Sequence, residues 1–428
     1  MAMIITAASN STALIDLPWS VPLQDWPADR LINLPHGLSR HVVRFVQVGG
    51  TIYACKELGH WAAEREYQLL RGLARLDVPS VEVVGVVTDR VAPNREPLEA
   101  VVVTRHLQFA LPYRVLFSRT VRHDTLPRTL DALAALLVRL HMAGFFWGDC
   151  SLSNALFRRD AGGFVAYMVD AETGELHQQL TDGQRMHDVD LARTNIMGEL
   201  MDLEAGGLLG QGLDPFEIGE TIVYRYLLLW AELTEPELVD PNEQFRIVER
   251  VRRLNRLGFD VGEMAIAAGP DGRRWKIQPT VVDPGHHQRR LLRLTGLDAE
   301  ENQARRLLCD LDRYRAQTGQ RDEPDDIVAH RWLAEKFEPV LRAIPRELRC
   351  RLQQAELFHE FLEHRWFLSE QAGWDVGADF AIRSYVRDVL ANKPDEGAVL
   401  AALAEPDDAL TEPDDALAEP HDADAPAR

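Results

Sequence analysis

The sequence feature that most constrains the fold is a short polar loop between two strongly patterned segments. The apolar spacing predicts a long helix over about 127–143, and alternation predicts a short β-hairpin over 154–170. The loop between them carries Asp149 and Asn154, five residues apart, and Asp170 ends the returning strand. Carboxylate and amide oxygens are ligands that magnesium prefers, and a carboxylate can deprotonate a hydroxyl. These three groups could therefore serve one magnesium-bound phosphate.

A cation is expected on a strand upstream of this loop. The pattern predicts a hairpin over 41–58 with two glycines at its turn, then a helix over 60–76 and two further strands. The second strand of the hairpin contains the sequence Y-A-C-K. Because side chains alternate along a strand, Ala54 and Lys56 share one face. This arrangement lets an adenine approach Ala54 while Lys56 reaches the α- and β-phosphates.

Together these segments resemble the signature motifs of protein-kinase-like enzymes. The strand Y-A-C-K is similar to their V-A-I-K, and W-G-D-C-S-L-S-N resembles their catalytic loop H-R-D-x-x-x-x-N. M-V-D-A-E stands where D-F-G would be. The details look most like the bacterial lipopolysaccharide (Kdo) kinase family and its relatives, the RIO kinases and aminoglycoside phosphotransferases. The resemblance covers roughly residues 35–195.

The resemblance implies a bilobal fold that uses ATP and Mg²⁺ as cofactors. Carried over by position, it makes Asp149 the catalytic base and Lys56 the cation that anchors the phosphates. It makes Asn154 and Asp170 the magnesium ligands. It also implies contacts to the nucleotide from Ala54, Gly37 and Leu156.

The same resemblance implies that Lys56 pairs with a glutamate on the following helix, where Glu64 and Glu66 are the candidates. Glu66 lies three, four and seven residues before three leucines, on the face expected to be buried. Glu64 aligns with polar residues on the solvent side. Because an inward-facing acid usually has a cationic partner, we predict that Glu66 pairs with Lys56.

Two departures from the kinase pattern leave a second function open. The first-strand region, residues 34–40, holds a single glycine, Gly37, so no Gly-rich loop is expected over the phosphates. The segment Asp170-Ala171-Glu172 lacks the Phe and Gly of D-F-G, and Glu172 is either an extra metal ligand or a solvated acid. The leading hypothesis is a phosphotransferase acting on a hydroxyl of a substrate of unknown class. The alternative is a nucleotide-binding pseudokinase that acts as a regulatory or scaffold module through its helical domain.

From about residue 215 onward the pattern predicts an almost wholly helical chain, which resembles an uncharacterised domain that accompanies kinase-like modules in bacterial proteins. A weaker interpretation is an interaction protein that acts through tryptophans of these helices, namely Trp332, Trp366 and Trp374.

We therefore predict an α+β protein, with a bilobal protein-kinase-like fold followed by an all-α C-terminal domain and a disordered acidic tail. The tail repeats L-x-E-P-D-D-A-L and has too few apolar residues to offset chain entropy. The expected divisions are an N-terminal arm over 1–30, a kinase-like domain over 31–205, a helical domain over 206–395 and the tail over 396–428.

Charge is distributed unevenly along the chain. The formal net charge is −20, and residues 404–428 contribute nine acids against one Arg. Such acidity argues against binding of nucleic acid or anionic lipid over the whole surface. Residues 246–290, by contrast, hold ten basic and five acidic groups. This segment is either a solvated helix face or a site for an anionic ligand, such as a phosphorylated substrate, a polyanionic partner or the acidic tail.

The remaining composition predicts the cellular setting. No apolar run approaches the roughly 18–20 residues that span a bilayer. The four cysteines form neither a disulfide framework nor a metal-binding pair. A soluble protein of the reducing cytoplasm is therefore expected.

Overall fold

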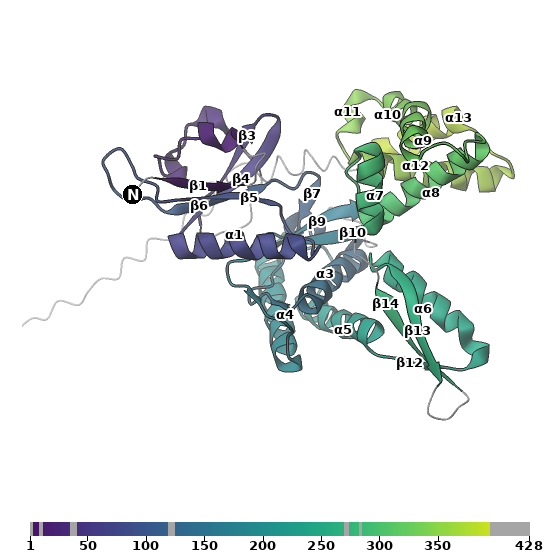
Figure 1. The fold of residues 1–428 in the computed structure, drawn as a ribbon, viewed down its shortest axis with the longest axis horizontal. Helices are drawn as coiled ribbons and strands as arrows, with labels where there is room; N and C mark the ends of the chain where they lie inside the picture. The colour runs from purple at the N-terminus through teal and green to yellow at the C-terminus, as the bar shows by residue number, and fades with distance from the viewer. Residues whose placement is uncertain are drawn as a thin grey trace, which may run out of the picture.

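Figure 1 shows the computed structural model of the chain. It describes residues 3–7, 12–34, 41–118, 125–268, 274–281 and 285–393. Two predictions lie outside these residues: the nucleotide contact of Gly37 and the disordered tail over 396–428.

The N-terminal lobe is a six-stranded antiparallel sheet with one helix packed on it (Figure 1). The strands lie in the order β1-β5-β6-β4-β3-β2, and their bounds are β1 Ile4–Ala7, β2 Leu31–Ile32, β3 Val43–Val48, β4 Thr51–Leu58, β5 Val83–Thr88 and β6 Ala100–Arg105. Helix α1 (His60–Arg75) packs against β5 and β6. Gly49 and Gly50 form the β3–β4 turn with φ of 58° and 82°, which glycine adopts without strain. The predicted hairpin, helix and strands are thus confirmed.

The N-terminal arm lies on this sheet. It supplies the edge strand β1 and short 3-10 helices, η1 (Thr12–Asp16), η2 (Leu23–Asp25) and η3 (Ala28–Arg30). Trp19 and Trp26 of the arm pack into the same core cluster as the strands. Buried Arg90 donates to the carbonyl of Trp19 at 2.9 Å and to Glu57 Oε1 at 2.6 Å, which fastens the arm to β4.

The C-terminal lobe forms around the long apolar helix α3 (Thr125–Met142). The predicted hairpin is present as β9 (Ala155–Asp160) and β10 (Gly163–Met168), and β10 packs against α3. The other elements of this lobe are β7 Ala110–Pro112, α2 Tyr113–Leu116, β8 Phe145–Phe146, β11 Glu175–Leu176, α4 Asp182–Ala205 and α5 Pro215–Thr234. The polar loop therefore lies between α3 and β9, where the sequence places it.

A small sheet interrupts the region after residue 206, which the prediction of an almost wholly helical chain missed. Strands β12 (Glu237–Val239), β14 (Trp275–Val281) and β13 (Val261–Ala268) pair in the order β12-β14-β13. The bounds of the helical elements beside them are η4 Pro241–Glu243 and α6 Gln244–Arg256. The missed signal is the alternation in W-K-I-Q-P-T-V, whose period of two is that of a strand.

Beyond the sheet, the C-terminal part is helical, as predicted. Its elements are α7 His286–Thr295, α8 Glu301–Gln317, α9 Asp325–Trp332, η5 Leu333–Phe337, α10 Glu338–Ala343, α11 Arg346–Arg349, α12 Gln354–Ala372, α13 Ala378–Ser384, η6 Tyr385–Val389 and η7 Leu390–Asn392. Trp332 is buried in their common core beside Phe358, whereas Trp366 and Trp374 are exposed. Within the described residues, no helix is both long and apolar enough to span a bilayer.

Two large hydrophobic cores lie along the chain, besides the smaller clusters of the N-terminal lobe. The first joins α3, α4 and α5 and includes buried residues from Leu70 to Phe259, and the second includes residues from Leu291 to Leu390. The boundary expected between residues 205 and 206 falls inside the first core, because α5 packs on both α3 and α4. The division of the chain into domains stays a prediction.

Candidate active site

The loop between α3 and β9 is fixed in place by one buried aspartate of α4. Asp188 is fully buried and accepts hydrogen bonds from the backbone N–H groups of Trp147 at 2.7 Å and Gly148 at 2.8 Å. His141 of α3 places Nε2 3.0 Å from the same carboxylate and Nδ1 2.7 Å from the hydroxyl of Tyr226. A network with all its polar groups satisfied holds the loop in one conformation.

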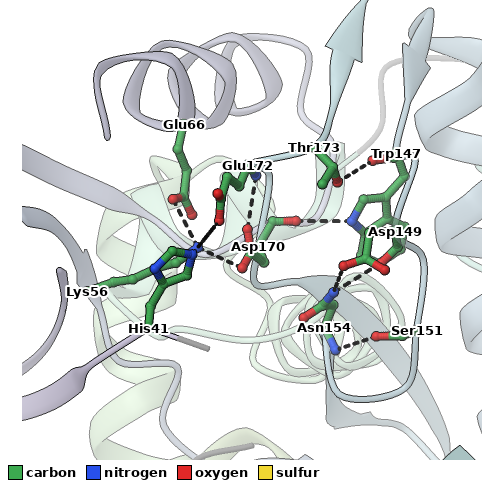
Figure 2. Close-up of polar contacts among 10 residues, drawn as sticks. All are labelled: His41, Lys56, Glu66, Trp147, Asp149, Ser151, Asn154, Asp170, Glu172 and Thr173. Atoms are coloured by element: carbon green, nitrogen blue, oxygen red, sulfur yellow. Dashed lines mark hydrogen bonds and ion pairs between the residues drawn. The ribbon is translucent and has the colours of Figure 1, made fainter. Parts of the chain in front are cut away.

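Asp149 lies between two asparagines. Asn154 Nδ2 donates to Asp149 Oδ2 at 3.2 Å, and Asn195 Nδ2 of α4 donates to Asp149 Oδ1 at 3.2 Å. Because each amide binds a different carboxylate oxygen, the plane of the carboxylate is fixed. The structure thus brings Asp149 and Asn154 side by side (Figure 2).

Glu199, also on α4, holds the remainder of the loop. Its two carboxylate oxygens accept hydrogen bonds from the backbone N–H groups of Leu152 at 2.6 Å and Ser153 at 3.0 Å. Sequence reasoning missed this residue together with Asp188 and Asn195. Their separations of seven and four residues place all three on one face of α4, and that polar spacing is the signal that could have revealed them.

Lys56 contacts three carboxylates (Figure 2). Its Nζ lies 2.6 Å from Asp170 Oδ2, 3.2 Å from Glu66 Oε2 and 3.4 Å from Glu172 Oε2. Glu66 is buried on the inner face of α1, where it contacts Lys56, whereas Glu64 is exposed on the other side of the helix. Three carboxylates around one ammonium group leave an excess of negative charge.

Glu172 is not a free solvated acid. Besides Lys56 it contacts His41, whose Nε2 lies 2.8 Å from Glu172 Oε2. Its backbone N–H also donates to Asp170 Oδ1 at 2.9 Å. Glu172 is therefore held at the site, and a carboxylate in this position can add an oxygen ligand to a metal ion.

The pKa values in this group follow from burial and charge. Burial alone would lower the pKa of Lys56, but the negative charges of Glu66, Asp170 and Glu172 outweigh it and raise that pKa, so the ammonium stays charged. Burial, with the charge of Asp170, raises the pKa of Glu66 to about 7 in spite of Lys56. A divalent cation beside Asp170 would offset the excess negative charge.

The residues predicted to hold magnesium stand at adjacent strand ends. Val169 N–H donates to the carbonyl of Asn154 at 3.0 Å, and the carbonyl of Asp170 accepts from Trp147 Nε1 at 3.0 Å. Because Asn154 uses its amide nitrogen on Asp149, its side-chain oxygen is left as a donor to a metal. Oxygen ligands of this kind suit Mg²⁺, so the residues present fit that ion.

The two predicted nucleotide contacts that the structure describes lie on β4 and β9. Ala54 is half-buried and pairs in register with Thr104 of β6. Leu156, also half-buried, pairs with Tyr167 of β10. Their contact with a nucleotide stays a prediction.

We expect Glu66→Gln to gain stability relative to the wild type as the pH rises, when both proteins are metal-free. The folded state holds the Glu66 proton up to about pH 7, whereas the unfolded state releases it near pH 4.5. As the pH rises between these values, the free energy of unfolding of the wild type falls by an amount on the order of 1–3 kcal/mol. The Gln side chain does not titrate, so Glu66→Gln does not suffer this loss. Denaturant unfolding in EDTA at pH 5 and pH 8 measures this difference. An equal difference at both pH values would show that Glu66 is ionised throughout.

Comparison with known proteins divides the chain into two matched parts. Residues 47–200 match the model of the lipopolysaccharide kinase (Kdo/WaaP) family, and residues 228–390 match a domain of unknown function (DUF4032). A solved structure titled "WaaP in complex with acyl carrier protein" overlaps 60% of this chain and 99% of its own, at 16% identity and a TM-score of 0.36. No curated protein matches the sequence. The N-terminal part is therefore kinase-like, as its motifs predicted, and a separate helical domain follows it.

Proposed function

We propose that the chain is an ATP- and magnesium-dependent phosphotransferase that acts on a hydroxyl group. The observation that carries this proposal is the grouping of Lys56 and its carboxylates with the Asp149–Asn154 pair on either side of Asp170 (Figure 2). One side offers a cation for phosphates and oxygen ligands for a metal. The other side offers a base held by two amides.

Each side chain has a defined part in the proposed reaction. Lys56 leaves Asp170 to bind the α- and β-phosphates, and Glu66 keeps its ammonium group in place. Asn154 and Asp170 hold Mg²⁺, which when bound neutralises charge on the transferring phosphoryl group. Asp149 accepts the proton of the substrate hydroxyl while Asn195 keeps its carboxylate oriented. The acceptor is a hydroxyl group that can reach Asp149. We also propose that the chain acts in the cytoplasm, where ATP is present.

A second candidate function is a nucleotide-binding pseudokinase that signals through the helical domain. The observation that favours this function is a direct contact between α8 and the β9–β10 hairpin, which begins directly after Asn154. At the tip of that hairpin, Asp160 accepts hydrogen bonds from the backbone of Asn302 at 3.2 Å and Gln303 at 2.8 Å. A phosphotransferase turns over ATP and a pseudokinase does not, so measuring ATP turnover distinguishes the two functions.

The nucleotide site is tested by thermal unfolding with and without ATP plus Mg²⁺, comparing the wild type with Asp170→Ala. Ligand that binds only the folded state raises the midpoint, by about 5 °C or more at a hundredfold excess over its dissociation constant. We expect Asp170→Ala to lose this rise, because it removes a metal ligand. The exposed control Asp312→Ala on α8 should keep it. An undiminished rise in Asp170→Ala would place the nucleotide elsewhere.

A further inference from the structure

A large cavity lies away from the Lys56–Asp149 site, between helices of the first hydrophobic core and polar residues of α8. Its volume is about 1070 Å³, and its walls come from α3, α5, α6, α8, one residue of α12 and the tip of the β9–β10 hairpin. This tip is six residues along β9 from Asn154, or about 20 Å at the rise of a strand. The cavity is therefore distinct from the proposed nucleotide site.

The walls carry an excess of positive charge. Eight arginines and five carboxylates line the cavity. Two of these arginines are neutralised in place, since Arg225 pairs with Asp131 and Arg253 with Glu232. Within the described part of the chain, the guanidinium groups of Arg252, Arg256 and Arg306 have neither an ion pair nor a hydrogen bond; these three are named the free arginines below.

A fourth arginine is held at the cavity by a backbone carbonyl and an aromatic ring. Arg139 of α3 donates to the carbonyl of Gly258 at 2.6 Å, and its guanidinium lies 4.7 Å from the ring centroid of Phe259. No carboxylate lies within ion-pair distance of it among the residues that the structure describes. Gly258 has a φ of 78°, and a Cβ there would lie 2.7 Å from the Arg139 guanidinium. This glycine therefore gives the cation the space it occupies.

The helices and the hairpin tip that form the walls are held together before any ligand binds. Asn302 Nδ2 donates both to Asp160 Oδ2 at 2.8 Å and to the carbonyl of Arg256 at 3.1 Å. Arg305 Nη2 donates to the carbonyl of Asn255 at 2.7 Å. These bonds tie α6, α8 and the hairpin tip together, so a ligand would not have to order them.

We propose that this cavity binds a small phosphorylated compound with at least two phosphate charges. Its phosphates would pair with the free arginines, because the planar guanidinium group matches phosphate oxygens in a bidentate way. Apolar side chains, among them Leu228 and Leu257, line the same cavity and suit the organic part of such a compound. The volume is at the upper end of the range of small-molecule sites.

The competing occupant is the acidic tail of the chain itself. The last described residue, Lys393, pairs through Nζ with Glu360 on α12, one helical turn from the cavity-lining Glu363. The described part of the chain therefore ends near the cavity. Its nine acids in residues 404–428 are spread along the sequence, whereas the free arginines face one cavity, which favours a compact ligand.

The test is calorimetric titration of the full chain with tripolyphosphate in the absence of magnesium. The double variant Arg256→Gln/Arg306→Gln removes one free arginine from α6 and one from α8. Its matched control, Arg246→Gln/Arg313→Gln, removes the same charge from the same two helices outside the cavity. Lys56→Met shows whether tripolyphosphate binds at the proposed nucleotide site. Deletion of 404–428 shows whether the acidic tail occupies the cavity.

We expect the cavity variant to bind tripolyphosphate at least tenfold more weakly than the wild type. The matched control and Lys56→Met should stay within about twofold. Equal loss in the matched control would show unspecific attraction and overturn the proposal, as would loss only in Lys56→Met. Binding that appears only after deletion of 404–428 would assign the cavity to the tail, and no binding to either chain would also overturn the proposal.

Discussion

Replacing Asp149 by Asn lowers the rate of phosphoryl transfer by about 10³-fold and leaves the affinity for ATP nearly unchanged. The amide cannot accept the proton of the attacking hydroxyl, so the step that needs a base is lost. Lys56, Glu66 and Asp170 remain in place to bind the nucleotide and its metal. Formation of ADP from ATP measures the rate, and calorimetric titration with ATP plus Mg²⁺ measures the affinity.

A matched control separates this effect from a general change in charge. Asp190→Asn removes one carboxylate from the exposed face of α4, where the aspartate pairs only with Arg193 at 2.7 Å. This variant should turn over ATP at the wild-type rate. Full activity in Asp149→Asn would show that Asp149 is not the base.

Replacing Asp188 by Ala costs about 3–5 kcal/mol of unfolding free energy and abolishes transfer. The change leaves the N–H groups of buried Trp147 and half-buried Gly148 without their acceptor, and an unsatisfied buried group costs about 1–3 kcal/mol. It also removes the carboxylate partner of His141. Denaturant unfolding measures the loss, and ADP formation reports the displaced loop.

The neighbouring variant Asp190→Ala provides the comparison for stability. It breaks a surface ion pair, which typically contributes less than about 1 kcal/mol. If Asp188→Ala and Asp190→Ala were destabilised to the same small extent, Asp188 would not be the residue that holds the loop between α3 and β9.

The sequence could predict those parts of the site that depend on local spacing. The positions of Asp149 and Asn154 follow from one loop, and the position of Lys56 follows from strand alternation. The choice of Glu66 follows from the buried face of one helix. Each of these inferences needs only a few neighbouring residues, which is why the hairpin, the helices and the central site residues were predictable.

Other parts of the site depend on contacts between distant segments. Asn195 and Glu199 reach the loop only because α4 packs beneath it, more than 40 residues later in the chain. Helix periodicity likewise cannot show that α5 joins the core of α3 and α4, so the division into domains stays a prediction. The cavity also brings Arg139 of α3 and Arg306 of α8 to one site, which no local pattern indicates.

The most direct test of the central claim is phosphorus-31 NMR of ATP and Mg²⁺ incubated with the wild-type chain, with Asp149→Asn in parallel. In the absence of the acceptor, water can take the place of the substrate hydroxyl. We predict that the wild type alone converts the ATP resonances to those of ADP and free phosphate, and that EDTA stops the conversion. ATP that binds but remains intact to the same extent in both proteins would contradict a phosphotransferase and assign the chain to the pseudokinases.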